Sequence, residues 1–449
     1  MTVSHSATEL DKLNIALEEG AFKQISHTLN NTLRPSEVAH LIEKSPPKER
    51  HLLWSLIHQD LEAEVLQDLG DDVQAEILSR MNTSEVLAIT ESLETDDLAD
   101  VMQQLPETVM RELLRSMDHQ DRERLEKVLS YPEDTAGGLM NTDAITIRPD
   151  ITIEAALRYL RRHDELPEMT DSLFVVSRKD SYVGTLPLTR MLVSDPNSTV
   201  REMMATDTPP IAAEMADDKV AQLFEQEDLV SAPVVDENNK ILGRITIDDV
   251  VDVIREDADH SLMSMAGLDE DEDTFAPILK TTRRRAVWLG INLITAFIAS
   301  AVIGVFEDTI EKVVALAVLM PIVASMGGIA GSQVLTLMIR GQALGHVERS
   351  NAGWLLNREI IVGVLNGLLW AIVVAVIAVL WFQDTTIGII IGCAIVINLF
   401  AAALAGTLLP IILKAWGIDP ALAGSVLLTT ITDVVGFLAF LGLATFFYS

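Results

Sequence analysis

The stretch from Asp419 to Gly436 reads DPALAGSVLLTTITDVVG and determines the class of fold. Asp-Pro is a typical helix start, and apolar or small residues continue to Phe447, with Asp433 as the single carboxylate. A helix rises about 1.5 Å per residue, so Asp433 lies about 20 Å beyond Pro420, inside a hydrocarbon layer about 30 Å thick. An ionised side chain there costs about 3 kcal/mol, which predicts a membrane helix with a function beyond anchoring.

The polar residues of this helix predict a cation site. Ser425, Thr429 and Asp433 are spaced four residues apart, so their oxygens lie on one helix face. One acid beside hydroxyl groups suits a hydrated cation better than an apolar substrate, and Asp419 is a further candidate ligand. The alternative is that Asp433 hydrogen-bonds a neighbouring helix for packing alone. Intramembrane acids more often belong to a transport pathway, which favours the cation site.

Charge divides the 449 residues into two unequal parts. The whole chain holds 66 acidic and 33 basic residues, whereas the part from Ala286 onward holds 8 and 5, so −30 of the −33 net charge precedes Ala286. So acidic a soluble part disfavours nucleic acid and anionic lipid as partners and favours cations. The same charge is equally consistent with ordinary solubility, which is the expected role of most of these residues.

Cysteine usage and the N-terminus bear on compartment and chemistry. Cys393 is the only cysteine and lies in an apolar run, which predicts neither a disulfide framework nor a cysteine metal site. The first residues, MTVSHSATELDKLN, lack a basic patch followed by an apolar core, so the soluble part is expected in the cytosol. No catalytic constellation and no P-loop are visible, so the sequence predicts no enzyme and no coupling to ATP hydrolysis.

Residues 1–130 predict an acidic α-superhelical domain. Apolar residues recur at helical spacing, as in Leu52, Leu53, Leu56 and Ile57. Helix-start or turn signals interrupt the pattern every dozen or so residues, at Pro46-Pro47, Gly70-Asp71, Asn82-Thr83, Thr95-Asp96 and Pro106. Repeated short helices of this kind are typical of a small α-superhelix.

Residues 139–258 contain one pattern of strand, turn, strand and helix twice, which predicts an α+β fold. The matching pairs, displaced by 59 residues, are Val175-Val176 with Val234-Val235 and Val183-Gly184 with Leu242-Gly243. The doubled unit resembles a tandem CBS domain, with one repeat at 139–200 and the next at 201–258. That resemblance implies a module that senses adenine nucleotides or metal ions, so ATP is a candidate ligand.

An acidic amphipathic helix and loop is predicted over residues 250–277. Arg283-Arg284-Arg285 follows, and positive charge at a membrane edge marks the cytoplasmic side. Residues 286–449 then contain five spans long enough to cross a bilayer, namely Ala286–Val305, Val313–Ile339, Ile360–Phe382, Ile387–Leu413 and Ala421–Phe447. Basic loop residues fall on the side of the arginine triplet. The sequence thus predicts a multi-pass protein of the plasma (inner) membrane, with cytosolic N-terminal domains and the C-terminus outside.

The second span has an irregularity of its own. Pro321 and the glycines at 327, 328 and 331 are predicted to break the helix in mid-membrane and to free backbone carbonyls. Irregular backbone is tolerated where it lines a cavity, so Gly328 and Ser332 are candidate pore-lining residues; a kink for packing alone is the alternative. Five helices make a thin wall for a pore, and Gly-x₃-Gly motifs offer close helix contacts, so a symmetric dimer is expected.

The order of these parts resembles the MgtE family of magnesium channels and transporters. The residues that carry the resemblance are Asp419-Pro420-Ala421, Thr429-Thr430 with Asp433 and Gly436, and Pro321 followed by Gly327-Gly328, Gly331 and Gln333. The resemblance implies a homodimer in a lipid bilayer, with the pore along the dimer axis and Asp433 as the central ion site. It also implies that the connecting helix acts as a plug.

The resemblance further implies a cytosolic magnesium sensor made of acids from three segments. They are Asp96 and Asp100 in the helical domain, Asp218 and Asp228 in the CBS pair, and Asp249, Asp252 and Asp257 on the connecting helix. Like charges brought together repel unless a divalent ion bridges them, which agrees with that role. The chain departs from the family pattern in the membrane spans at Ile329, Ser332 and Val426, and on the connecting helix at His260 and Ser261. The family's ion selectivity and strength of closure therefore do not carry over to this chain from the resemblance alone.

The sequence as a whole predicts a homodimeric, cytosol-gated channel or transporter for divalent cations, with Mg²⁺ as the first candidate. Mg²⁺ gives up water reluctantly, so Asp433 from two subunits would hold a hydrated ion. An importer of cobalt or another divalent metal is one alternative, although no His or Cys ligand lies near Asp433 in the sequence. A membrane-anchored nucleotide or metal sensor that conducts nothing is the other, and it would tolerate Asp433→Leu.

Overall fold

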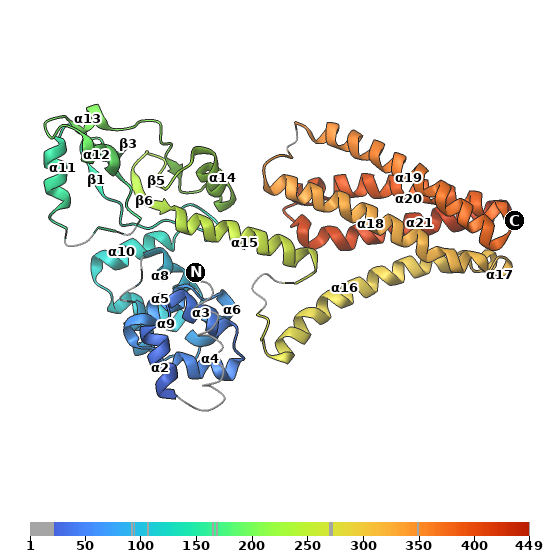
Figure 1. Cartoon of the computed structure of the whole chain (residues 1–449), viewed down its shortest axis with the longest axis horizontal. Helices are drawn as coiled ribbons and strands as arrows, with labels where there is room; N and C mark the ends of the chain where they lie inside the picture. The colour runs from blue at the N-terminus through green and yellow to red at the C-terminus, as the bar shows by residue number, and fades with distance from the viewer. Residues whose placement is uncertain are drawn as a thin grey trace. The chain divides into compact units, whose positions relative to one another are not determined.

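The computed structural model describes residues 22–90, 93, 95–105, 107–163, 166–167, 169–268, 273–347 and 350–448. The chain forms two compact units. One consists of Met1–Asp257 with Asp271–Ala276, and the other of Ala258–Glu270 with Pro277–Ser449. The first unit contains the helical domain and the CBS pair, and the second contains the long apolar helices (Figure 1).

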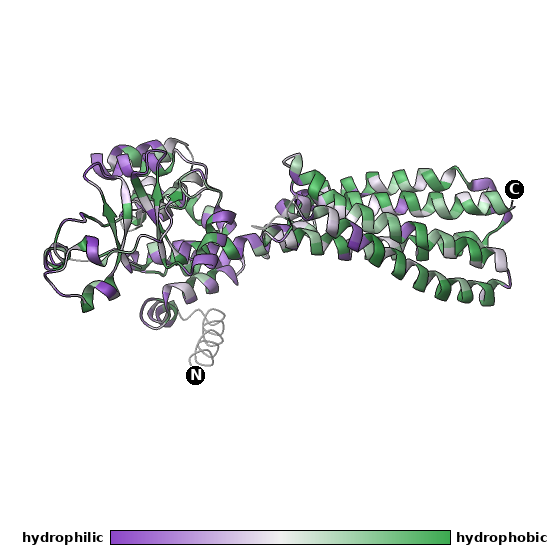
Figure 2. Ribbon diagram, turned by 90° about the horizontal axis from the view of Figure 1, so that it is seen from above, coloured by the Kyte–Doolittle hydropathy of each residue, from purple (hydrophilic) through white to green (hydrophobic). Residues whose placement is uncertain are grey.

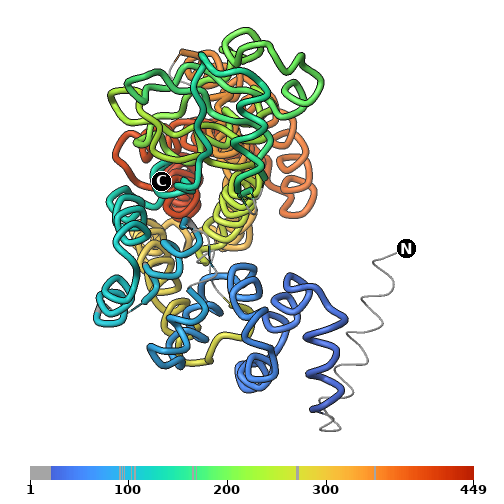
Figure 3. Tube along the Cα trace, turned by 90° about the vertical axis from the view of Figure 1, so that its left-hand side faces the viewer, coloured from blue at the N-terminus to red at the C-terminus, as the bar shows by residue number. Residues whose placement is uncertain are grey.

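The N-terminal domain is a succession of short helices (Figures 1 and 3). They are α2 (Phe22–Asn31), α3 (Pro35–Glu43), α4 (Pro47–Trp54), α5 (Gln59–Gln67), α6 (Asp71–Leu78), α7 (Thr83–Thr90), α8 (Thr95–Gln103), α9 (Glu107–Ser116) and α10 (His119–Val128). Helices begin at each predicted break, because proline and capping residues end the preceding helix or start the next. Residues 1–21 of the predicted domain lie outside the described residues.

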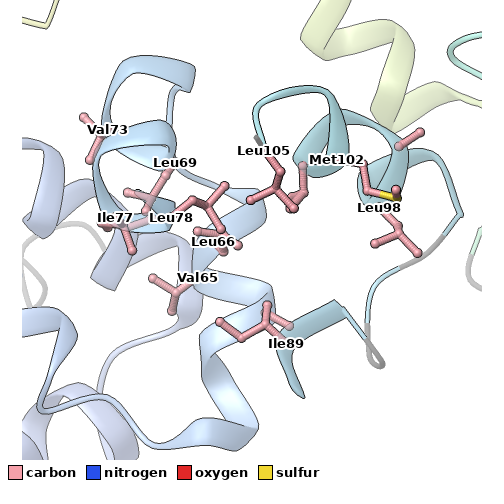
Figure 4. Packing of buried hydrophobic residues seen from close by; sticks show 14 of the residues in the cluster. Val65, Leu66, Leu69, Val73, Ile77, Leu78, Ile89, Leu98, Met102 and Leu105 are labelled. Carbon is pink, nitrogen blue, oxygen red and sulfur yellow. The ribbon is translucent and has the colours of Figure 1, made fainter. Parts of the chain in front are cut away.

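Buried apolar side chains hold these short helices together. Val65 and Leu66 of α5 pack with Ile77 of α6 and Met102 of α8 in one core (Figure 4). A helix of eight to ten residues is marginal on its own in water, so this packing supplies most of its stability. The same core continues into the second CBS repeat through residues such as Phe224.

Each CBS repeat folds as a three-stranded sheet. In the first, β1 (Thr146–Ile147) pairs in parallel with β2 (Ser172–Val176), which pairs antiparallel with β3 (Tyr182–Pro187). The second repeats this order with β4 (Ile211–Ala212), β5 (Ser231–Val235) and β6 (Ile241–Thr246). The helices are α11 (Ile153–Leu160), α12 (Leu188–Val193), α13 (Val200–Met203) and α14 (Asp217–Glu227). The bounds of β2 and β5, and of β3 and β6, differ by 59 residues, which confirms the predicted repeat.

Two matching glycines let the repeats interlock. Gly243 of β6 lies beside Asn141, in the segment of the first repeat that leads to β1, and a Cβ at Gly243 would be 2.4 Å from the Asn141 carbonyl oxygen. Gly184 of β3 lies beside Ala205, in the segment of the second repeat that leads to β4, and a Cβ at Gly184 would be 2.3 Å from the Ala205 carbonyl oxygen. Each repeat therefore pairs with the segment that leads into the other, and only glycine fits at these contacts.

Helix α15 (Ile247–Met265) follows β6 directly and lies where the acidic connecting helix is predicted, although it begins before residue 250. The described chain resumes at Asp273, whose carboxylate oxygens accept bonds of 2.7 and 2.6 Å from the Arg50 guanidinium. Arg50 is completely buried, and the Phe275 ring centroid lies 5.9 Å from it. This ion pair ties the segment before the first apolar helix to the N-terminal domain.

The second unit is built from long apolar helices (Figure 2). They are α16 (Ile278–Gly304), α18 (Ala315–Ala343), α19 (Ala352–Phe382), α20 (Thr385–Ala415) and α21 (Pro420–Tyr448), with the short α17 (Glu307–Lys312) between the first two. Within the described residues, these five are the helices long and apolar enough to cross a membrane. Helix α20 packs against α18, α19 and α21 and is the most buried of the five.

The predicted break in the second span is wrong. Helix α18 is continuous from Ala315 to Ala343, with Pro321 inside it. Proline removes one backbone donor near the helix start, and the remaining turns continue in helical form. Gly327 and Gly331 instead allow close approach, because a Cβ at either would overlap Asn398 or Leu428.

Candidate functional site

The start of α21 is fixed by Asp419. Its two carboxylate oxygens each accept a 2.9 Å hydrogen bond, from the backbone N–H groups of Ala421 and Leu422. A carboxylate in this place satisfies donors of the first helical turn and is favoured by the helix dipole. His260 of α15 lies next to it, with Nε2 3.2 Å from Oδ2. The structure thus places Asp419 as a helix cap, and its role as an ion ligand stays a prediction.

The predicted ladder on α21 faces outward from the helix packing. Thr429 is exposed, and Ser425 and Asp433 are half-buried, whereas the adjacent Leu428 and Thr432 are buried. The Thr429 hydroxyl donates to the carbonyl oxygens of Ser425 and Val426, at 3.0 Å each. Its oxygen lone pairs therefore stay available to a cation or its water.

Asp433 has no hydrogen bond or ion pair to any described residue of this chain. An acid retained only for helix packing would be expected to have such a partner, because an unpaired carboxylate is costly away from water. The surroundings of Asp433 thus favour the cation-site prediction over the packing alternative.

Helix α18 adds a second polar surface. It packs directly against α21, and a Cβ at Gly328 would meet no atom within 4 Å. Ser332 is exposed, as are Ser325, Gln333 and Thr336, and Ile329 is 57% exposed between them. A single copy of the chain therefore leaves polar side chains of both α18 and α21 uncovered. The predicted pore residues lie on these two helices, and their role as a pore stays a prediction.

A carboxylate cluster in the first unit is the second candidate site. It joins four parts of that unit, which contribute Asp68 and Asp71 around the start of α6, Asp97 and Asp100 of α8, Glu133, and Asp248, Asp249, Asp252 and Glu256 of α15. Asp97 and Asp100 are three residues apart, so they share a face of α8. The acids of α15 follow at the same kind of spacing.

Burial and mutual repulsion shift the pKa values of this cluster upward. Asp100 reaches the surface of α8, but desolvation by the surrounding protein, with Glu133 and Asp97 nearby, raises its pKa to about 8. Burial and the neighbouring Asp248 raise the pKa of Asp249 to about 7. The pKa of Asp97 is raised to about 6, chiefly by burial. Ionised carboxylates are thus disfavoured here unless a cation compensates them.

The cluster includes only some of the predicted sensor residues. Asp100, Asp249 and Asp252 belong to it, and Asp257 lies on the same helix α15. The side chain of Asp96 lies outside the described residues. Asp218 and Asp228 lie at the two ends of α14, where Asp218 pairs with Lys219 at 3.6 Å, and no interaction described here joins them to the cluster.

Sequence reasoning missed the remaining members, which are Asp68, Asp71, Asp97, Glu133, Asp248 and Glu256. The spacing of Asp97 and Asp100 was the available signal, since side chains three residues apart on a helix are neighbours. Within the described ranges, no three His, Cys, Asp or Glu side chains converge at metal-binding distances. An oxygen-only donor set of this kind suits Mg²⁺ held through its water shell.

Comparisons with known families match all three parts of the chain. A model described as a divalent cation transporter (MgtE) matches residues 320–443, the MgtE intracellular N domain matches residues 33–134, and CBS domains match residues 136–194 and 200–256.

Two curated relatives align over nearly the whole chain. The magnesium transporter MgtE of Thermus thermophilus is 30% identical over 437 residues, covering 96% of this chain and 97% of the relative. The magnesium transporter MgtE of Bacillus subtilis is 28% identical over 438 residues, covering 97% and 96%. Among solved structures, the cytosolic domain of the Mg²⁺ channel MgtE in complex with ATP is similar, with a TM-score of 0.50 and 31% identity. The matched region covers 54% of this chain and 99% of that structure.

Proposed function

The chain belongs to the MgtE family of divalent cation transporters, and from this premise we propose that it moves Mg²⁺ across a membrane with Asp433 as the ion site. The observation that carries the proposal is a carboxylate without a protein partner on an apolar helix, beside an exposed threonine hydroxyl. Mg²⁺ dehydrates reluctantly and binds carboxylates and waters, so such a site suits it.

The transporting species in this proposal is a homodimer. One copy of the chain leaves Asp433 only half-buried and leaves Thr429 and the polar residues of α18 exposed. Contact between lipid and an ionised carboxylate costs about 3 kcal/mol. We therefore propose that a second copy of the chain shields these polar residues from lipid. Two symmetric copies place two Asp433 carboxylates around one axis, and their combined charge attracts a divalent ion.

The orientation follows the charges at the helix ends. Arg283, Arg284 and Arg285 lie near the start of α16, and Arg340 and Lys414 lie at the ends of α18 and α20 that fall on the same side. Positive charge is retained in the cytosol, so the N-terminal domains are cytosolic and the C-terminus is outside, in the plasma (inner) membrane.

The carboxylate cluster is proposed to sense cytosolic Mg²⁺. Desolvation is the largest cause of the raised pKa values of Asp100, Asp97 and Asp249, and repulsion by neighbouring carboxylates adds to it. Bridging ions would offset this repulsion, hold the helical domain against α15 and favour closure. Several sites at a kcal/mol or two each approach the roughly 5.5 kcal/mol that inverts a two-state population.

Nucleotide binding is a subordinate part of the proposal. The similar cytosolic domain was solved with ATP, which supports ATP as a ligand of the CBS pair here. Isothermal titration of the full-length protein with ATP, with and without Mg²⁺, tests this. Absence of binding heat in both conditions contradicts it. Cobalt and other divalent metals remain alternative substrates, and competition assays separate them from Mg²⁺.

The test of transport uses purified protein in liposomes with an entrapped fluorescent Mg²⁺ indicator. Asp433→Ala is expected to abolish Mg²⁺ flux, because it removes the charge that holds the ion, while size-exclusion chromatography still shows a dimer. Asp433→Asn should retain at most weak, less selective flux. Wild-type flux from Asp433→Ala would overturn the assignment of Asp433 and favour a pathway elsewhere.

A further inference from the structure

Asn398 is a polar side chain buried in the middle of α20, among apolar helices. Its exposed fraction is 0%, and its Oδ1 has no hydrogen-bond partner among the described residues. Burying an amide in an apolar environment is costly unless its hydrogen bonds are made. The position therefore requires a specific reason for an asparagine.

One hydrogen bond supplies that reason. Asn398 Nδ2 donates to the backbone carbonyl oxygen of Val323 on α18, at 2.8 Å and across 75 positions of sequence. A carbonyl oxygen only accepts, so the amide nitrogen must face it, which fixes the orientation of the side chain. The bond joins α20 to α18 at the depth where water is absent.

Two glycines form the notch that holds the Asn398 amide. A Cβ at Gly327 of α18 would lie 2.2 Å from Asn398 Nδ2, and a Cβ at Gly436 of α21 would lie 2.7 Å from the same atom. Asn398 thus fits where α18 and α21 both lack a side chain. Close approach at small residues is a common basis of helix association in membranes.

The notch adjoins the proposed ion pathway. Gly327 precedes Gly328, whose Cβ position is open, and Gly436 lies three residues from Asp433. Successive helix residues point about 100° apart, so fixing Gly327 against Asn398 also fixes the direction in which Gly328 faces. The same holds for Asp433 relative to Gly436.

We propose that Asn398 is a positioning residue that sets the rotation and spacing of α18 against α21, and thereby the choice among divalent cations. The inference rests on the proposed transport function and deepens it. Asn398 does not contact the ion; it acts through the backbone of Val323 and the two glycines. Loss of the amide leaves the two pathway helices free to shift, and the spacing around a hydrated ion changes.

The test measures flux of Mg²⁺ and of Co²⁺ in the same liposomes and compares their ratio. Asn398→Leu replaces the amide by an apolar group of similar size, and Asn398→Ala removes it without added bulk. Both are expected to change the ratio by about threefold to tenfold, which corresponds to one interhelical hydrogen bond. The matched control is Thr407→Val on the same helix, since Thr407 is equally buried but bonds only to Ala403 of its own helix.

A merely structural role would lower the yield of folded dimer without changing this ratio per folded dimer. A second comparison covers the case in which Asn398→Leu does not fold. Gly327→Ala should impair flux in the wild-type background and be relieved in the Asn398→Ala background, because the removed amide leaves room for the new methyl group. Additive effects of the two changes overturn the proposed contact.

The outcomes separate this inference from the proposed function. Wild-type flux with an unchanged ratio in both Asn398 variants, or an equal change in Thr407→Val, overturns the positioning role alone. Absence of any divalent flux in the wild type overturns the proposed function and this inference together.

Discussion

Thr429 and Thr432 are two threonines of one helix with opposite surroundings. Thr429 is exposed beside Asp433, and Thr432 is completely buried, with its hydroxyl donating to the Leu428 carbonyl oxygen at 3.0 Å. Valine has the same shape as threonine and lacks the hydroxyl. The pair therefore compares an exposed threonine hydroxyl with a buried one on the same helix.

Thr429→Val is expected to lower Mg²⁺ flux about tenfold, because it removes one hydrogen-bonding oxygen worth about 1 to 1.5 kcal/mol from the ion or its water. The liposome flux assay measures it. Thr432→Val should leave flux near the wild-type rate. Equal losses in both variants would assign the effect to helix packing and remove Thr429 from the pathway.

Arg50 is a second residue whose environment predicts a measurable effect. Its side chain is 1% exposed, and its partner Asp273 is 10% exposed. Arg50→Ala would remove the buried guanidinium that neutralises the Asp273 carboxylate, at a cost of about 3 to 5 kcal/mol in unfolding free energy. Amide hydrogen exchange of α4 in the full-length protein measures this.

Arg80→Ala is the control for that measurement. Arg80 is 60% exposed and lies 3.6 Å from Glu76, so its loss should change the unfolding free energy by less than about 1 kcal/mol. Similar exchange rates in the two variants would show that the Arg50 pair contributes no more than a surface ion pair.

Among the elements, α18 has glycines with two different roles. Some allow close packing against neighbouring helices, and one lies on the side proposed to line the pathway. Gly327 and Gly331 face α20 and α21, whereas the Cβ position of Gly328 is open. Gly328→Val is expected to reduce Mg²⁺ flux at least about tenfold, because the valine side chain would narrow the proposed pathway. The yield of folded protein should not change. Flux and thermal unfolding of the same preparation check both halves of the expectation.

Gly290 of α16 provides the matched control for Gly328, because a Cβ there also meets no atom within 4 Å. Gly290→Val should leave flux unchanged, since α16 carries no residue of the proposed pathway. Normal flux in Gly328→Val would show that this part of α18 does not line the pathway.

For the whole molecule, the carboxylate cluster predicts a coupled response to pH and Mg²⁺. The pKa of Asp100 is raised from 3.8 to about 8, so the folded arrangement binds more protons than the unfolded chain between these values. Stability then falls as the pH rises from about 4 to about 8, because the ionised carboxylate is poorly solvated in the folded arrangement and is repelled by its acidic neighbours. The pKa values of about 7 for Asp249 and about 6 for Asp97 likewise lower the stability as the pH rises.

Without divalent ions, cleavage of the full-length protein near Tyr131–Gly138 by a protease of constant activity should accelerate from pH 5 to pH 8. Millimolar Mg²⁺ should remove this dependence, whereas NaCl of matched ionic strength should not. The double variant Asp249→Asn and Asp252→Asn should lose the protection by Mg²⁺ and should show a weaker dependence on pH, because Asp100 and Asp97 still titrate in this range. Equal cleavage with and without Mg²⁺ would contradict the sensor and leave the pathway proposal standing.

Local signals in the sequence determined the organisation of this protein. Proline and turn or capping residues marked where α4, α6, α7, α8 and α9 begin, and Asp-Pro marked the start of α21, because these residues restrict the backbone at their own positions. The displacement of 59 residues determined the paired sheets, and uninterrupted apolar runs determined the five membrane helices. The isolated Asp433 was recognisable for the same reason, since a charge in such a run stands out.

Only the tertiary structure decided which of these parts meet. Arg50 pairs with Asp273 across 223 positions, Asn398 reaches Val323 across 75, and the acids of α8 face those of α15. The continuity of α18 through Pro321 was also decided by packing. The physical reason is that membrane helices are apolar on every side, because lipid is as apolar as a protein interior, so their sequences do not mark the face that packs. Glycine notches and single buried polar groups choose that face, and their partners lie far away along the chain.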